Sequence, residues 1–189
     1  VPVGDDQKQH LELCRDIAQK FNNDYKIENF FIVTEPLIKK EFSRIMSLKD
    51  GLKKMSKSEV SDLSRINLTD DKDQIINKIK KAKTDTLPLP SKIEELENRP
   101  EAKNLIGIYS SLMNNKLQKT IDEFAGKNFS EFKEKLSEIV VNEINPISFK
   151  IKELLDDKVF LEKILKDGYE KANEIASKKI KKIQEIVGF

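Results

Sequence analysis

The chain has 189 residues, of which 38% are hydrophobic and 36% charged, so it can form a folded core and is not a wholly disordered protein. Its 35 basic and 33 acidic residues leave a net charge of only +2, so total charge alone predicts no nucleic-acid partner. It lacks the run of about 18 apolar residues that a membrane span needs, and its single cysteine, Cys14, excludes an internal disulfide and favours a reducing compartment.

The first residues are typical of a strand that runs directly into a helix. Residues 1–4 (VPVG) are short and apolar, and apolar residues recur at helical spacing from about Asp5 to Asn22. Asp5 and Asp6 fall in the first turn, where the helix dipole favours negative charge. Because the chain opens at the end of a secondary element, we expect it to be truncated.

Two short segments have the composition of strands. Residues 30–33 (FFIV) are aromatic and β-branched, which predicts a buried strand, and residues 44–48 (RIMSL) are a weaker candidate. Residues 49–58 follow without apolar periodicity, which predicts a mobile loop.

Helices are expected in most of the remaining chain. Asp71 and Gln74 have the spacing of a capping box, which predicts a helix to about Ala82. A short helix is expected over residues 91–98, and Pro100 suits the first turn of a helix ending near residue 114.

A long apolar stripe predicts a helix from about Asn128 to residue 155. The spacing of three and four is the same on both sides of Pro146, so we expect one kinked helix rather than two. A final helix should begin at residues 156–157 and end at Gly188.

The strongest chemical signal is the run Lys54-Met55-Ser56-Lys57-Ser58. Two lysines on a flexible loop can follow a triphosphate as charge moves to the leaving pyrophosphate, and serine hydroxyls add donors. The alternative is a solvated basic loop without a ligand. The order of the five residues, after a strand candidate and a Gly-containing turn, favours the first interpretation.

The second signal is Gly4-Asp5-Asp6-Gln7 at the expected strand-to-helix junction. In open α/β sheets ligands bind at the carboxyl ends of strands, near helix N-termini. A glycine there allows close approach of a ligand, and an acid can bind ribose hydroxyls. The alternative is that both acids only cap the helix.

Several stretches together resemble a known family. The runs VPVGDDQKQHLELCRDIAQKFN, KDGLKKMSKS, INLTDDKDQIINKIKKAKTD, RPEAKNLIGIYSSL and IASKKIKKIQEIVGF are similar to those of bacterial tryptophanyl-tRNA synthetases, which are class I aminoacyl-tRNA synthetases. The likeness covers nearly the whole chain and is closer to the tryptophan enzymes than to their tyrosine relatives.

The resemblance implies a mainly α fold with a small α/β part. Residues 1–65 would be the second half of a Rossmann-type catalytic domain, residues 66–155 a helical anticodon-binding region, and residues 156–189 a terminal helix that packs back toward the nucleotide domain. The reaction would join tryptophan to ATP as tryptophanyl-adenylate, with release of pyrophosphate, and then transfer the tryptophanyl group to tRNA.

Residue roles follow from the same resemblance. Lys54 and Lys57 would be the catalytic, pyrophosphate-stabilising lysines, and Gln7 would lie nearest the tryptophan. The ATP-binding residues would be Gly4, Asp5, Asp6, Ile45, Lys54, Met55, Ser56, Lys57 and Ser58. Mg²⁺ would bind through ATP, with no metal site formed by the protein.

The family's first signature, a His-x-Gly-His-type element, is absent from this sequence. We therefore expect an inactive C-terminal fragment of a cytoplasmic enzyme that is a homodimer at full length, binds tRNA(Trp), ATP and L-tryptophan, and has no membrane partner. The alternative is a non-catalytic module that binds tRNA or a partner chain. His10 and Cys14 are expected to be structural, Cys14 as a packed small residue.

A basic cluster at residues 178–182 has two interpretations. Its lysines could contact tRNA phosphates, or they could form a solvated helix face balanced by nearby acids, and the second is favoured. Tyr109 and the phenylalanines fit apolar stripes, so no aromatic residue is singled out for RNA recognition.

Overall fold

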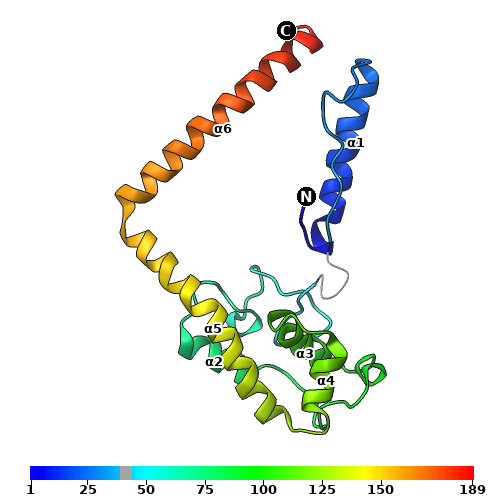
Figure 1. Cartoon of the computed structure of the whole chain (residues 1–189), viewed down its shortest axis with the longest axis vertical. Coiled ribbons are helices and arrows are strands. Elements are labelled where there is room, and N and C mark those ends of the chain that lie inside the picture. The colour runs from blue at the N-terminus through cyan, green and yellow to red at the C-terminus, as the bar shows by residue number, and fades with distance from the viewer. Residues whose placement is uncertain (39–43) are drawn as a thin grey trace. The chain divides into compact units, whose positions relative to one another are not determined.

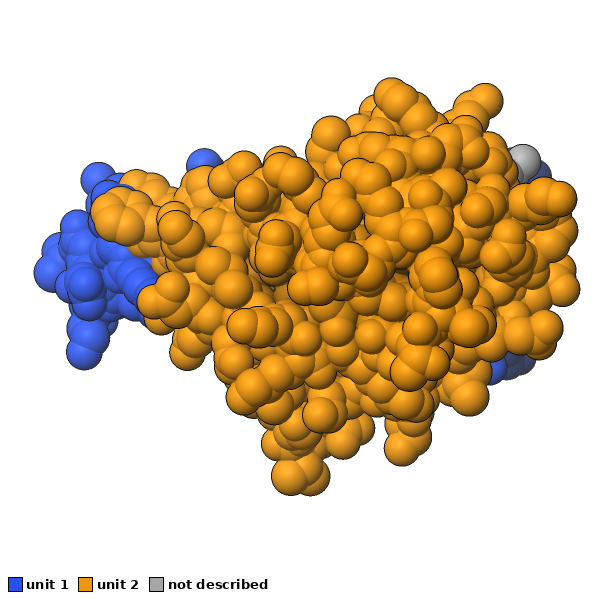
Figure 2. Space-filling model, turned by 90° about the horizontal axis from the view of Figure 1, so that it is seen from below, with its two compact units in different colours: residues 1–37, 151–189 blue, residues 38–150 orange. Residues whose placement is uncertain are grey.

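A computed structural model of the chain describes residues 1–38 and 44–189, with the side chain of Asp6 also outside the description. The chain divides into two compact units, each treated separately below (Figure 1). The first comprises residues 1–37 and 151–189, and the second comprises residues 38–150, which Figure 2 shows in orange.

The first unit begins with a parallel pairing of two extended segments. Val3 N donates to Leu37 O at 3.2 Å, and Leu37 N donates to Val1 O at 2.8 Å. Between them lie the 3₁₀-helix η1 (Asp5–Gln7) and helix α1 (Lys8–Asp24). Parallel segments need such a crossover connection. The predicted passage from an extended segment into a helix is therefore present, but Pro2 and Leu37 form an isolated bridge rather than the predicted strand.

Residues 30–33 do not form a strand, and that prediction was wrong. The rings of Phe30 and Phe31 lie 5.3 and 4.9 Å from the ring of Phe21 at the end of α1. The side chain of Asn22 donates to Phe31 O at 2.8 Å and accepts from Phe31 N at 3.0 Å. An aromatic cluster and one amide side chain thus supply the packing and hydrogen bonds that a sheet neighbour would have supplied.

Helix α6 (Lys158–Val187) completes the first unit. Asp157 caps its N-terminus by accepting from Phe160 N at 3.0 Å, and Gly188 ends it with φ of 97°, where glycine is favoured. No residue of α6 is buried. Lys179 ties the helix to the aromatic cluster, since its ammonium lies 3.6 Å from the centre of the Phe30 ring and donates to Phe30 O.

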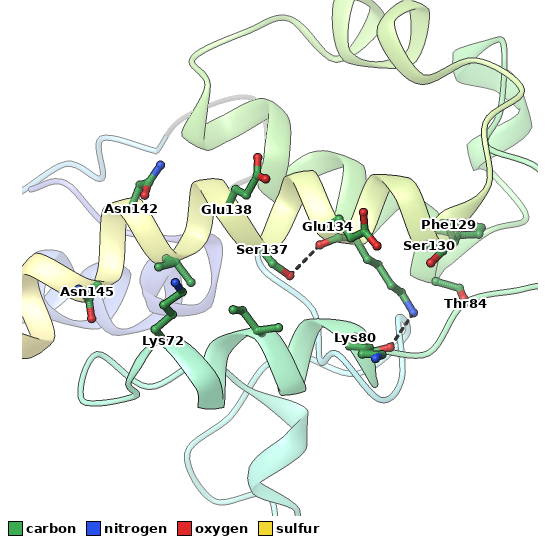
Figure 3. A pocket seen from close by; sticks show the side chains of 13 residues that line it. Lys72, Lys80, Thr84, Phe129, Ser130, Glu134, Ser137, Glu138, Asn142 and Asn145 are labelled. Atoms are coloured by element: carbon green, nitrogen blue, oxygen red, sulfur yellow. Dashed lines mark hydrogen bonds between the residues drawn. The ribbon is translucent and has the colours of Figure 1, made fainter.

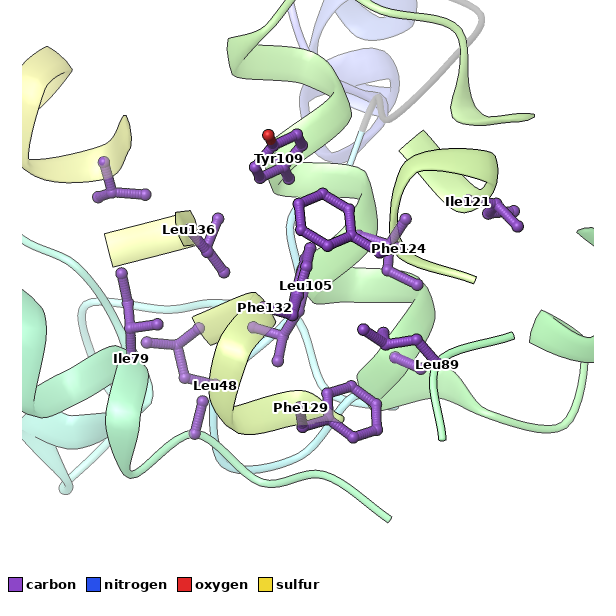
Figure 4. Close-up of a cluster of buried hydrophobic side chains, with 14 of the residues drawn as sticks. Leu48, Ile79, Leu89, Leu105, Tyr109, Ile121, Phe124, Phe129, Phe132 and Leu136 are labelled. Atoms are coloured by element: carbon purple, nitrogen blue, oxygen red, sulfur yellow. The ribbon is translucent and has the colours of Figure 1, made fainter. Parts of the chain in front are cut away.

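The second unit is helical apart from its first segment. It contains η2 (Asp62–Ser64), α2 (Lys72–Lys80), η3 (Ile93–Leu96), α3 (Pro100–Leu112), α4 (Leu117–Phe124) and most of α5 (Phe129–Asp156). At its centre the rings of Tyr109, Phe124 and Phe132 meet at 4.9–5.7 Å (Figure 4). Tyr109, Phe124 and Phe132 thus serve the core, as expected, whereas Phe149, Phe160 and Phe189 are exposed.

Local signals placed most helix ends correctly. Both bonds of the capping box form at α2, because Gln74 N donates to Asp71 and Asp71 N donates to Gln74, each at 2.9 Å. Helix α5 continues through Pro146, so the prediction of one helix rather than two is confirmed. The expected helix at residues 91–98 is shorter and is the 3₁₀-helix η3, while α4 was not predicted.

The expectation of a mainly α protein is confirmed. The described residues form no extended strand, and pairing is limited to two isolated bridges, Pro2 with Leu37 and Met46 with Lys54. Residues 44–48 therefore contribute one bridge rather than the predicted strand.

Candidate functional site

The lysine loop, residues 54–58, begins on a short hairpin formed by residues 45–55. Ser47 N donates to Lys53 O at 2.8 Å, and Met55 N donates to Ile45 O at 3.1 Å. These two bonds bracket Lys54, which pairs with Met46 in an antiparallel bridge. Ile45, predicted to lie against adenine, is half-buried and directly bonded to the lysine loop.

The hairpin rests on the helical core at two points along residues 46–48. The side chain of Asn104 on α3 accepts from Met46 N at 2.9 Å and donates to Met46 O at 2.8 Å. Leu48, which is buried, donates to Ser64 O and accepts from Lys83 N. Both backbone groups of each residue are satisfied, which holds this segment in place without a sheet around it.

The turn of the hairpin lies directly against the first turn of α3. A Cβ on Gly51 would lie 2.5 Å from Glu101 N and 2.5 Å from Pro100 C, so only glycine fits here without movement. The carboxylate of Glu101 accepts a hydrogen bond from the Gly51 backbone and pairs with Lys83 at 2.8 Å. The Lys83 ammonium is the main reason that the pKa of Glu101 lies below its usual value.

The tip of the lysine loop is exposed and rich in donors. Met55 is half-buried and packs against the core, whereas Lys54, Lys57 and Ser58 are exposed. The hydroxyls of Ser56 and Ser58 lie 2.8 Å apart, and Ser58 N donates to Ser56 Oγ at 3.3 Å. Within the described part of the chain the Lys57 ammonium makes no ion pair. Ammonium and hydroxyl groups of the loop tip therefore lie on a surface that an anion can reach.

The chain leaving the loop is anchored by a buried lysine. Lys78 on α2 is 3% exposed, and its ammonium lies 2.6 Å from carboxylates of Asp70 and Asp62. The hydrogen bond that Lys78 donates to Asp62 is the main reason that the pKa of Asp62 lies below its usual value. Arg65, in the same segment, donates to Glu59 O at 2.9 Å, just after the loop. Both ends of the loop are thus fixed.

The second predicted element, residues 4–7, lies in the first unit. Gly4 precedes η1 with extended backbone angles, and its carbonyl accepts from Gln7 N at 3.0 Å. Asp5 and Gln7 are exposed, and the side chain of Asp6 lies outside the described residues. An extended segment thus runs into a helix here, as strands do at the ligand-binding edges of α/β proteins.

The structure therefore brings Ile45 together with residues 54–58, while residues 4–7 belong to the other unit. Sequence reasoning missed Asn104 and Lys78, which support the loop from α3 and α2. A signal for Asn104 existed, since it is the one amide within a largely apolar stretch of α3. Lys78 carried no such signal because it falls in a lysine-rich run.

The structure does not bring the remaining candidate residues, Cys14, His10 and the basic cluster, together in one site. Cys14 is exposed, so the expectation of a packed residue was wrong, and His10 is exposed on α1. In the basic cluster, Lys178 pairs with Glu174 at 2.8 Å and Lys179 is engaged by Phe30. Among the described residues no group of three His, Cys, Asp or Glu side chains is arranged to hold a metal ion, and no helix could cross a membrane.

A groove of about 1110 Å³ lies between α2 and α5 in the second unit (Figure 3). Lys133 spans it, donating to Ala82 O at 2.7 Å and to Lys80 O at 3.3 Å. Burial lowers the pKa of this lysine. The groove contains none of the residues that the sequence singled out, and its lysine serves to cap the end of α2.

The family model of tRNA synthetases class I (W and Y) matches residues 1–144 of the chain. Among curated proteins, the tryptophan–tRNA ligases of Rickettsia felis and Caulobacter vibrioides are 52% and 50% identical over 189 residues. Each match covers 100% of this chain but only 56% and 55% of the relative. The chain thus spans a little over half the length of these relatives.

Solved structures agree with the sequence matches. The tryptophanyl-tRNA synthetase of Mycoplasma pneumoniae superposes with a TM-score of 0.82 at 29% identity, covering 99% of this chain and 55% of that one. The Campylobacter jejuni enzyme, complexed with ADP and tryptophan, gives a TM-score of 0.68 at 30% identity, covering 100% of this chain and 56% of that one.

Proposed function

The chain belongs to the class I tRNA synthetases of the tryptophan and tyrosine group, and from this premise we propose that it is the C-terminal part of a tryptophan–tRNA ligase. The proposed reaction joins L-tryptophan to tRNA(Trp) and converts ATP to AMP and pyrophosphate. Two findings support the choice of tryptophan over tyrosine. The curated relatives reported above are tryptophan–tRNA ligases, and the Campylobacter jejuni relative was crystallised with tryptophan and ADP.

In this proposal the lysine loop stabilises the leaving pyrophosphate. Attack of the tryptophan carboxylate on the α-phosphorus of ATP breaks the bond to the β-phosphate oxygen, so negative charge grows on the pyrophosphate. Lys54 and Lys57 carry positive charges on flexible stems that can follow this charge, and Ser56 and Ser58 supply hydroxyl donors. A loop with an exposed tip between fixed ends suits this role, because ATP can reach the tip while the backbone on either side is held.

The remaining residues would bind the other parts of the substrates. Ile45 would lie against adenine, and Gly4 with Asp5 and Asp6 would contact the adenosine, with Asp6 on the ribose. Gln7 would lie nearest the tryptophan. Mg²⁺ would enter with ATP as part of the substrate, for which the phosphates supply most of the oxygen ligands.

The partners follow from the same reaction. Residues 66–155 would bind the anticodon end of tRNA(Trp), with the domain limits at 65 and 155 as proposed boundaries and residues 156–189 packing toward the nucleotide domain. The whole enzyme would act in the cytoplasm as a homodimer without a membrane partner.

The observation that carries this proposal is the lysine loop within a chain that tryptophan–tRNA ligases match along its whole length. The test is a chimera in which this chain replaces the matching part of the Caulobacter vibrioides ligase. We expect the chimera to charge tRNA(Trp) with tryptophan, and not with tyrosine. Replacing Lys57 by Ala should reduce ATP–pyrophosphate exchange by roughly 100-fold, as expected for loss of a group that stabilises transition-state charge.

The 189-residue chain alone is the second arm of this test. We expect it to give no exchange above its own Lys57→Ala variant, because the family's first ATP signature is not in its sequence. A chimera that folds but charges no tryptophan would contradict the ligase proposal. If that chimera is inactive and the 189-residue chain still binds tRNA(Trp) selectively, the non-catalytic module is favoured instead.

A further inference from the structure

Asn104 stands out among the residues that the proposed reaction does not use. The residue is 5% exposed, and both polar atoms of its side chain are bonded to the backbone of a single residue, Met46. A side-chain amide has the same donor and acceptor as a peptide group, so α3 presents to Met46 what a neighbouring strand would present. The described residues around Met46 form no sheet that could do this instead.

The backbone groups on the two sides of Met46 face the opposite way. Ser47 N and Ile45 O bond to Lys53 O and Met55 N, the two residues that bracket Lys54. In an extended chain successive peptide groups point in opposite directions. The segment at residues 45–47 therefore links Asn104 on one side with the start of the lysine loop on the other, one peptide unit away.

We propose that Asn104 is a positioning residue for the lysine loop, holding the segment at residues 45–47 so that Lys54 and Lys57 are presented in a fixed place. The role of the lysines rests on the proposed function, whereas the mechanical role of Asn104 does not. Gly51, in the turn of the same hairpin, also contacts α3. This second contact is at the first turn of the helix, one helical turn from Asn104. Helix α3 therefore supports the hairpin from which the lysine loop begins.

Amide hydrogen exchange in the 189-residue chain tests the mechanical part. Asn104→Leu keeps the side-chain size and removes both bonds to Met46. We expect the amides of Ser47 and Met55 to exchange at least roughly tenfold faster, because local opening of the hairpin becomes easier. The core amides of α5 should exchange as before.

Ser110→Ala is the matched control. Ser110 is also buried on α3 and also bonds to a backbone carbonyl, but that carbonyl belongs to Asn115, at 2.7 Å, and not to the hairpin. It should leave the hairpin amides unchanged. Hairpin amides that remain protected in Asn104→Leu, or that lose protection only together with the core, would overturn the proposal. If that variant does not fold, Asn104→Ser, which is smaller and keeps a hydroxyl, takes its place.

The same substitutions in the Caulobacter chimera test the link to catalysis. Asn104→Leu should lower kcat for ATP–pyrophosphate exchange by roughly tenfold per titrated active site, with KM for tryptophan unchanged, because misplaced charge is felt in the transition state. Ser110→Ala should match the parent. An unchanged kcat in Asn104→Leu would overturn the positioning role. An inactive parent chimera would instead count against the proposed function, and hydrogen exchange would still decide the role of Asn104.

Discussion

Replacing Lys78 by Met tests how the segment after the lysine loop is held. Methionine keeps the length of the apolar stem but removes the ammonium that lies 2.6 Å from both Asp70 and Asp62. The two carboxylates are in different surroundings, since the side chain of Asp70 is 5% exposed and that of Asp62 is 55% exposed. Asp70 keeps its hydrogen bonds from Asn67, at 2.8 and 3.2 Å, but loses its counter-ion.

The magnitude follows from this difference in exposure. Breaking a buried pair by removing one partner costs about 3–5 kcal/mol, because a charge is left uncompensated in the interior. A pair with an exposed partner contributes about 0–1 kcal/mol. We therefore expect Lys78→Met to lower the free energy of unfolding by about 3 kcal/mol, mostly through Asp70. Asp62→Asn should have a much smaller effect, because the Asp62 carboxylate is exposed and its pairing is screened by water.

Urea unfolding followed by far-ultraviolet circular dichroism measures these changes. At about 4 °C per kcal/mol, the loss in Lys78→Met also corresponds to a Tm about 12 °C lower. Adding Asp70→Asn to Lys78→Met should restore at least about 1 kcal/mol, because the unpaired buried charge is then gone. A loss below about 1 kcal/mol in Lys78→Met, or no recovery in the double variant, would refute the assignment of Lys78 and Asp70 as a buried ion pair that anchors this segment.

Three further predictions concern other parts of the chain. Gly51→Ala should lower the free energy of unfolding by roughly 1–3 kcal/mol, because its Cβ would lie 2.5 Å from backbone atoms of α3. The control Gly168→Ala, which has open space around it in α6, should be neutral or stabilising in the same urea assay. Equal effects of the two substitutions would contradict the close contact at Gly51. Burial first, and then a neighbouring carboxylate, raise the pKa of Tyr109 to about 12. Since the folded-state pKa is raised, the contribution of Tyr109 to stability is complete below about pH 10 and is lost as the pH rises toward 12. Between pH 9 and 12 the free energy of unfolding of the wild type should therefore fall by roughly 2 kcal/mol more than that of Tyr109→Phe. Urea midpoints that change in parallel in the two proteins would disprove this. Lys179→Met should speed amide exchange in the last turns of α6 by removing its contacts with the aromatic cluster, whereas Lys182→Met should not, and identical exchange in both variants would argue against that tether.

Much of the helical part of the fold was predictable because its signals are local. The capping box at Asp71 and Gln74 needs only four consecutive residues to form, and the helix through Pro146 is indicated by an apolar spacing that continues across it. The strand predicted at residues 30–33 failed for the opposite reason. Aromatic and β-branched residues favour a buried strand, but here Phe30 and Phe31 are half-buried against Phe21 at the end of α1 and Ile32 is exposed. The contact with α1 is not in the local pattern.

The candidate site divides in the same way. The sequence by itself determined the family, and it singled out the lysine loop as the proposed phosphate-binding element, because a short run of Lys, Met and Ser residues carries its chemistry in the order of its side chains. Only the tertiary structure decided how that loop is held. Asn104 lies 58 residues from Met46 along the chain, and Gly51 meets the first turn of α3. Such contacts depend on how distant segments pack in the folded chain, and for this reason the support of the loop could not be read from the residues that form it.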